Sequence, residues 1–140
     1  MLGDVPMIDL MDETFVLAPR ASAAAIIGDR ARWRAWWPGL IPVVYLDRGL
    51  DGMRWTVSGE LVGSAEIWLE AWSDGVILHY YLRADPTVPG SSTRARPAPV
   101  TARGQRQVQE LSRRHAVRWK RHAWAIKDEL ESSHVASGTS

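Results

Sequence analysis

Apolar and polar residues follow two different periods along this chain, and the change of period separates its predicted elements. Between residues 8 and 83, several segments alternate apolar and polar positions or carry β-branched runs, which is typical of strands. After residue 101, apolar residues recur every three or four positions, as in an amphipathic helix. We expect five strands, over residues 8–17, 41–47, 52–61, 64–72 and 76–83.

Two short helices are expected between the first and second strands. The first covers residues 20–28, RASAAAIIG, where Pro19 suits the start of a helix and Gly28 its end. The second covers residues 30–37, RARWRAWW, with Asp29 as its N-cap, and Pro38-Gly39 follows it.

The last two strands are expected to form a hairpin whose register can be counted from its turn. Asp74-Gly75 is a typical two-residue hairpin loop. This loop places Glu70 opposite His79 and Glu66 opposite Arg83. Opposite charges facing each other across strands stabilise a sheet by roughly 0.2–1 kcal/mol each, so the charge pattern agrees with this register.

A three-residue loop at residues 61–63 is expected to join the third and fourth strands. It places Trp55 beside Leu69 and Ser58 beside Glu66, and it separates the sheet into an apolar and a charged face. A slip by one residue would mix charges into the apolar face. The apolar face contains Met53, Trp55, Val57, Ala65, Ile67, Leu69, Ala71, Leu78, Tyr80 and Leu82.

The C-terminal part of the chain divides into a loop, a helix and a tail. Residues 85–100 contain four prolines and no apolar period, so we expect a loop. A helix is expected from an N-cap at Thr101 to about Glu131, followed by a disordered tail over residues 132–140. The helix has one apolar stripe, formed by Val108, Leu111, His115, Trp119, His122, Ile126 and Leu130.

Composition narrows the class of protein. The 140 residues suit a single domain, here residues 1–131. The absence of cysteine excludes disulfides, thiolate nucleophiles and iron–sulfur clusters. The N-terminus lacks a basic signal region and no apolar run is long enough to span a bilayer, so a cytoplasmic protein without integral membrane association is expected.

Charge is distributed unevenly although the net charge is only +1. Residues 1–93 carry a net charge of −5, residues 94–127 carry +9, and residues 128–140 carry −3. The basic charges are spread around the predicted helix without a nucleic-acid-binding motif, so no nucleic-acid partner is expected. A solvated helix surface is the simpler interpretation, and attraction of an anionic ligand or lipid headgroup is the alternative.

The order of elements and two motifs resemble a known superfamily. The segment VLAPRASAAAIIGDRARWRAWWP, residues 16–38, and the helix RWKRHAWAIKDELE, residues 118–131, are similar to those of START-like (SRPBCC) proteins, particularly the bacterial polyketide cyclase/dehydrase and lipid-transport group. This resemblance implies an α+β helix-grip fold, in which a curved antiparallel sheet wraps around a long C-terminal helix. It also implies an apolar cavity between sheet and helix that holds a hydrophobic or aromatic small molecule or lipid.

Six residues are candidates for such a ligand site. The apolar faces of the sheet and helix provide Trp55, Leu69, Tyr80 and Trp119 as walls, although the same residues could simply fill the core. His115 and His122 are candidate polar anchors or acid–base groups, or else histidines at the cavity rim bonded to backbone or water. Seven residues separate their backbones by roughly 10.5 Å along a helix, so no metal site is expected.

Three functions remain open from the sequence. The first is binding, transport or sequestration of a hydrophobic small molecule without a cofactor. The second is a cofactor-independent polyketide cyclase or dehydratase that uses a cavity histidine as acid–base. The third is an interaction protein whose cavity is vestigial. Separately, Trp68 and Trp124 are candidates for a homodimer contact. Trp33, Trp36 and Trp37 lie on one short helix, where they close one end of the sheet or form a ligand gate.

Overall fold

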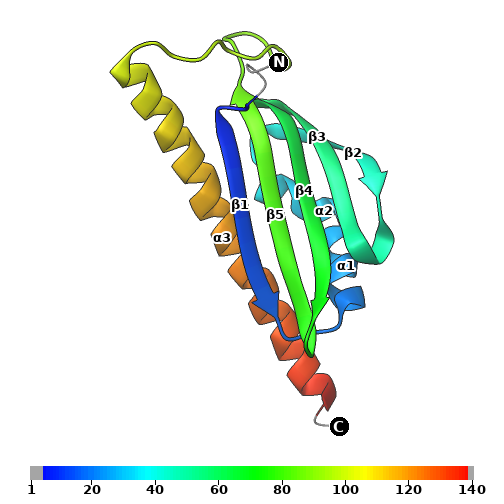
Figure 1. The fold of residues 1–140 in the computed structure, drawn as a ribbon. Coiled ribbons are helices and arrows are strands. Elements are labelled where there is room, and N and C mark those ends of the chain that lie inside the picture. Colours follow the sequence, from blue (N-terminus) through cyan, green and yellow to red (C-terminus); the bar gives the residue numbers. More distant parts are fainter. Residues whose placement is uncertain (1–4, 139–140) are drawn as a thin grey trace.

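The computed structural model describes residues 5–138, in which five strands and three α-helices follow the predicted order (Figure 1). A short 3-10 helix, η2 (Gly49–Asp51), lies between the second and third strands. The other elements are β1 (Ile8–Val16), α1 (Arg20–Ile27), α2 (Arg30–Trp36), β2 (Leu40–Asp47), β3 (Gly52–Gly59), β4 (Leu61–Trp72), β5 (Gly75–Pro86) and α3 (Ala102–Gly138).

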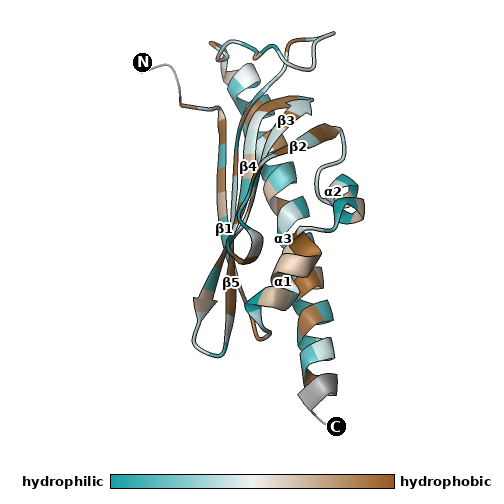
Figure 2. Cartoon of the chain, turned by 90° about the vertical axis from the view of Figure 1, so that its right-hand side faces the viewer, coloured by the Kyte–Doolittle hydropathy of each residue, from teal (hydrophilic) through white to brown (hydrophobic). Residues whose placement is uncertain are grey.

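The five strands form one antiparallel sheet in the order β1-β5-β4-β3-β2. The helices α1, α2 and α3 all lie on one face of this sheet, and the other face is left uncovered (Figures 1 and 2). This two-layer arrangement confirms the helix-grip fold. Asp29 caps α2 as predicted, since its side chain accepts a hydrogen bond from the Ala31 backbone amide at 3.1 Å.

The apolar face of the sheet is the one predicted. It packs against the helices and is buried at nine of the ten expected positions. Ala71 is the exception: it is exposed near the end of the β4–β5 hairpin. The core also takes in Ile8 and Val16 of β1, Leu61, and Ala84 of β5.

The register of the β4–β5 hairpin differs from the prediction by two residues. Trp72 pairs with Gly75, so the two loop residues are Ser73, with φ +53°, and Asp74. Gly75 is the first residue of β5, and β1 passes close to it. Only a residue without a Cβ fits there, since a Cβ would lie 2.3 Å from the Val16 carbonyl oxygen. A shift by two keeps every side chain on its predicted face.

The β3–β4 register differs from the prediction by four residues. Trp55 pairs with Ala65 rather than Leu69, because the chain turns at residues 59–60 instead of 61–63. Gly59 has a φ of +118°, a conformation that strongly favours glycine and permits this tighter turn. An even shift again leaves the two faces unchanged.

The charged rows on the uncovered face are consequently different from those predicted. Glu66 forms an ion pair with Arg54 at 2.9 Å rather than with Arg83, and Arg83 lies 3.4 Å from Asp9. The predicted row of Ser58, Glu66 and Arg83 is therefore wrong. Glu70 faces Ile77 across the strands, but its carboxylate still reaches His79 diagonally, at 2.8 Å.

The proline-rich segment is shorter than predicted and is tied to the sheet. Residues 85 and 86 belong to β5, and Thr87 forms an isolated bridge with Ala95. The Thr87 hydroxyl donates to the backbone oxygens of Gly59 at 2.7 Å and Glu60 at 3.1 Å. These bonds connect the start of the loop to the β3–β4 turn.

The long helix α3 begins where the sequence predicts and extends further. Thr101 caps it, because its hydroxyl accepts from the Gly104 amide at 3.0 Å. The helix continues past Glu131 to Gly138, so the disordered tail predicted over residues 132–140 is wrong for residues 132–138, and residues 139–140 lie outside the described part. Within residues 5–138, no helix is both long and apolar enough to cross a membrane.

Polar contacts fix the C-terminal half of α3 to β1. The Lys120 ammonium lies 3.0 Å from a carboxylate oxygen of Asp12, and the Lys127 ammonium donates to the Phe15 carbonyl at 2.7 Å. Glu131 accepts from the Leu17 amide at 2.9 Å. The N-terminal strand and α3 are thus held together by one ion pair, between Asp12 and Lys120, and by hydrogen bonds to backbone groups, as well as by apolar packing.

Candidate functional site

Six aromatic rings meet between the sheet and the helices, and they form what we call the aromatic cluster. Helix α2 turns Trp33 and Trp36 inward, since residues three apart share one face of a helix, and Trp37 follows at its C-cap. Strands β3 and β5 and helix α3 supply the other three rings. The cluster consists of Trp33, Trp36, Trp37, Trp55, Tyr80 and Trp119, each at most 5% exposed.

Four of the six predicted ligand-contacting residues are buried in or around this cluster. Trp55, Leu69, Tyr80 and Trp119 are all at most 2% exposed. The ring of Tyr80 stacks on Trp119, with centroids 4.0 Å apart and planes 9° apart. Trp55 contacts Trp37 at a centroid distance of 4.9 Å. The rings therefore fill the space where the resemblance implies an open cavity.

Some polar atoms of the cluster form hydrogen bonds and others do not. The Trp37 indole N–H donates to the Tyr80 hydroxyl at 2.9 Å. Burial raises the pKa of Tyr80 well above its ordinary value, so its hydroxyl stays protonated at neutral pH. The indole N–H groups of Trp55 and Trp119 are buried and have no acceptor among the described residues. Each such group costs about 1–3 kcal/mol of desolvation that no hydrogen bond offsets.

His115 lies on α3 and contacts the β3–β4 turn. It is 3% exposed, and its Nε2 lies 2.9 Å from a carboxylate oxygen of Glu60. Burial lowers the pKa of His115, and the hydrogen bond with Glu60 offsets this effect only in part. The imidazole is therefore neutral at pH 7 and can accept or donate a proton.

This lowered pKa predicts a pH dependence of stability. The unfolded chain binds more protons than the folded chain below about pH 6.5, so the free energy of unfolding falls as the pH is lowered through that range. We expect the variant His115→Gln to show a shallower fall than the wild type in urea denaturation at pH 7 and pH 5. His134→Gln, at an exposed position of α3, is the matched control for the exchange of histidine for glutamine. Equal slopes for wild type and His115→Gln would contradict this prediction.

His122 lies about two turns further along α3 and has a different environment. It is partly buried, and burial lowers its pKa, against a raising contribution from a hydrogen bond with the Ala35 backbone. Its side chain borders a cavity of about 410 Å³ that opens on the surface of α3. The two predicted histidines therefore lie in separate environments, His115 at the β3–β4 turn and His122 at the edge of the surface cavity.

Sequence reasoning missed Glu60 as the partner of His115. The sequence pattern places Glu60 in a strand, whereas in the structure the tight turn after Gly59 brings its carboxylate to α3. A Gly-Glu pair at a hairpin turn is a weak signal, because its position relative to a helix depends on the register. The three neighbouring tryptophans of the sequence, Trp33 and Trp36 in α2 and Trp37 at its C-cap, are all buried beneath the sheet.

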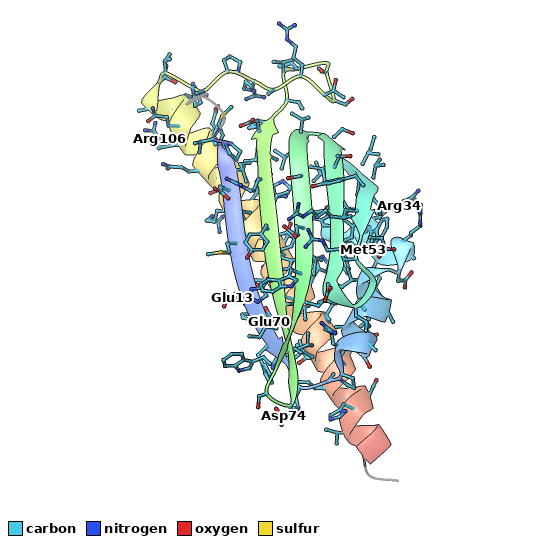
Figure 3. All side chains as sticks on the ribbon, turned by 45° about the vertical axis from the view of Figure 1, so that its right-hand side comes forward. Glu13, Arg34, Met53, Glu70, Asp74 and Arg106 are labelled. Atoms are coloured by element: carbon cyan, nitrogen blue, oxygen red, sulfur yellow. The ribbon has the colours of Figure 1, made fainter. Side chains whose placement is uncertain are left out.

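The uncovered face of the sheet carries polar pairs and exposed aromatic side chains. His79 is stacked on Trp68 and lies between the carboxylates of Glu13 and Glu70, which Figure 3 labels on this face. Trp68 and Trp124 are 36% and 55% exposed, in agreement with the expectation that they are accessible. A homodimer contact through them stays a prediction.

The fold has counterparts among solved structures. No family model matches the chain, and no curated protein matches its sequence. The Aha1 dimer of Colwellia psychrerythraea is similar, with a TM-score of 0.54, 11% identity and coverage of 89% of this chain and 96% of that one. Protein Ms6760 of Mycobacterium smegmatis has a TM-score of 0.52, 10% identity and coverages of 96% and 95%. The protein TTHA0849 of Thermus thermophilus has a TM-score of 0.51 and 9% identity, and the match covers 89% of this chain and 98% of that one.

Proposed function

Because the chain has the helix-grip fold of START-like proteins, we propose that it binds a hydrophobic or aromatic small molecule between its sheet and α3. The proposed walls are Trp55, Leu69, Tyr80 and Trp119, with His115 as a polar group at one end. The ligand would carry at least one hydrogen-bond acceptor, such as a carbonyl or ether oxygen.

The two indole N–H groups without acceptors carry this proposal. Buried polar groups in folded proteins are hydrogen-bonded in the great majority of cases, so two such donors within one cluster call for an explanation. Trp55 and Trp119 come from opposite layers of the fold, and both contribute rings to the same cluster. An oxygen-bearing ligand among these rings would satisfy the donors and gain apolar contact at the same time.

Access to this space is favoured by the way α3 is attached. The polar contacts described above hold residues 120–131 against β1 and Leu17, and Glu129 also pairs with Arg32 of α2 at 2.8 Å. In the first half of α3, the side-chain hydrogen bond to the rest of the described chain is that of His115 with Glu60. Figure 1 shows this first half diverging from β1 toward the end that joins the loop. Movement of that half would open the sheet–helix space toward the loop end, beyond the attachment at Lys120.

Two probes of similar size test whether an acceptor oxygen matters. Benzophenone has a carbonyl between two phenyl rings, and diphenylmethane has a methylene group in its place. We expect the wild-type protein to bind benzophenone about 5–10 times more tightly, as one added hydrogen bond provides. The ratio of the two dissociation constants is measured by quenching of tryptophan fluorescence.

Substitutions that keep an aromatic ring identify the donors. Trp119→Phe removes one of the two N–H donors and should lower the ratio, and the double variant Trp55→Phe/Trp119→Phe should bring it close to one. Trp124→Phe, on the exposed side of α3, should leave it unchanged. Failure of both probes to bind the wild type would refute the proposed function. Equal affinity for the two probes would show that the indole donors do not contact the ligand.

Acid–base catalysis by His115 is a second candidate, and its contact with Glu60 favours it. A buried neutral imidazole held by a carboxylate is suited to moving protons during cyclisation or dehydration of a polyketide-like substrate. Turnover of a poly-β-ketone thioester should then fall at least about 100-fold in His115→Ala. Turnover that survives in the double variant His115→Ala/His122→Ala would eliminate this candidate.

A further inference from the structure

Helix α3 presents a cluster of basic side chains beside the proposed ligand space. A surface cavity of about 410 Å³ is lined by Arg113, Arg114, Val117, Arg118, Arg121 and His122. At 100° per residue, three of the arginines, at positions 114, 118 and 121, fall within an arc of about 60° on the helix. They therefore face one common region rather than the solvent in all directions.

These three arginines lack carboxylate partners in the described part of the chain. Arg113 is paired with Glu110 at 2.7 Å, but no acidic side chain of residues 5–138 lies within 4 Å of Arg114, Arg118 or Arg121. Like charges three or four residues apart destabilise a helix by about 0.2–0.5 kcal/mol per pair. The arrangement thus has a cost to folding that an anion in the cavity would offset.

Arg118 is close in the helix to both the cavity and the aromatic cluster. Its side chain is only partly exposed, and its neighbours along α3 are Trp119 of the aromatic cluster and, one turn on, His122. Burial, and to a smaller extent the positive charge of Arg118, lowers the pKa values of His115 and His122. Arg118 thus lines the surface cavity and directly precedes a ring of the aromatic cluster.

We propose that the cavity lined by Arg114, Arg118 and Arg121 binds the anionic group of the molecule whose apolar part lies between the sheet and α3. This inference rests on the proposed function and narrows it: the ligand is an anionic amphiphile. Guanidinium groups bind carboxylate, sulfonate and phosphate oxygens through paired N–H donors. The shared requirement is an oxyanion attached to an apolar body.

Two fluorescent probes that differ by one anionic group provide the test. 8-Anilino-1-naphthalenesulfonate carries a sulfonate, whereas N-phenyl-1-naphthylamine has the same ring system without it. Replacing Arg118 with glutamine should weaken binding of the sulfonate probe about tenfold, as expected for loss of one charge-assisted hydrogen bond. Binding of the neutral probe should change less than about twofold. Both dissociation constants are measured by fluorescence titration at constant ionic strength.

Arg106 provides the matched control. It lies on the first half of α3 and projects away from the sheet (Figure 3), so Arg106→Gln removes the same charge outside the cavity. The affinity of Arg106→Gln for the sulfonate probe should equal that of the wild type. Retained binding of the neutral probe by Arg118→Gln also shows that this variant is folded.

The outcomes separate this inference from the proposed function. If the neutral probe does not bind the wild type, the proposed function fails, and this inference fails with it. If the neutral probe binds but Arg118→Gln leaves the affinity for the sulfonate probe unchanged, only this inference fails. An equal loss in Arg118→Gln and Arg106→Gln would also overturn it, because general surface charge would then account for the binding. Inorganic phosphate binding as tightly as the sulfonate probe would overturn it by showing a site for free oxyanions.

Discussion

Replacing Trp119 with alanine is expected to lower the free energy of unfolding by about 3–5 kcal/mol, the usual cost of removing a large buried ring. Trp119 is 2% exposed, stacks on Tyr80 at 4.0 Å and packs edge-on against Trp36 at 5.7 Å. Alanine would remove both ring contacts and leave a hole, because the rigid sheet and α2 cannot move inward far enough to fill it. Urea denaturation at pH 7 measures the change.

Trp124, on the opposite side of α3, is the control for this prediction. It is 55% exposed, and its main described contact is with the Lys120 ammonium, 5.8 Å from the ring centroid. Trp124→Ala is therefore expected to cost at most about 1 kcal/mol, the value of an exposed cation–π contact. A similar small loss for Trp119→Ala would show that the aromatic cluster does not hold α3 to the sheet.

Replacing Gly59 with alanine is expected to destabilise the chain by at least about 2 kcal/mol, because two costs coincide there. Its φ of +118° is unfavourable for any residue with a Cβ, and that Cβ would lie 2.3 Å from the Gly39 carbonyl oxygen. The β3–β4 turn would have to shift, and Glu60 would move with it. We therefore also expect the pH dependence of stability that His115 contributes to change in this variant.

A substitution at Gly90 measures the backbone cost alone, without the steric clash that is expected at Gly59. Gly90 has a φ of +82°, but nothing lies within 4 Å of a Cβ built there. Gly90→Ala retains only the backbone cost, roughly 1–2 kcal/mol. Thermal and urea denaturation of the two variants in the same buffer give the comparison. Equal losses would mean that the close approach of Gly39 to Gly59 contributes nothing.

The sequence was sufficient to predict the elements and the faces of this fold. The caps at Asp29 and Thr101 depend on local chemistry, and the alternation along β3, β4 and β5 depends only on which side chains avoid water. Both hairpin registers were wrong, by two and by four residues. Even shifts leave the faces unchanged, so the hydrophobic pattern could not detect them.

The contents of the interior were harder to predict. Periodicity places Tyr80 and Trp119 on facing surfaces, but whether their rings leave a gap or stack depends on the curvature of the sheet and the distance of α3. The partner of His115 depends on the turn at Gly59, which the wrong register hid. The helix beyond Glu131 was missed because its last turns lack an apolar stripe, and helical propensity alone is a weak guide.

The most direct test of a ligand site between sheet and helix is to follow the indole N–H resonances of the tryptophans while benzophenone is added. Single Trp→Phe variants assign the signals. We expect the resonances of Trp55 and Trp119 to shift with a saturating dependence on benzophenone concentration, because these buried donors gain an acceptor. Those of the exposed Trp72 and Trp124 should stay in place. Interior resonances that do not move at saturating benzophenone, or shifts confined to Trp72 and Trp124, would contradict it.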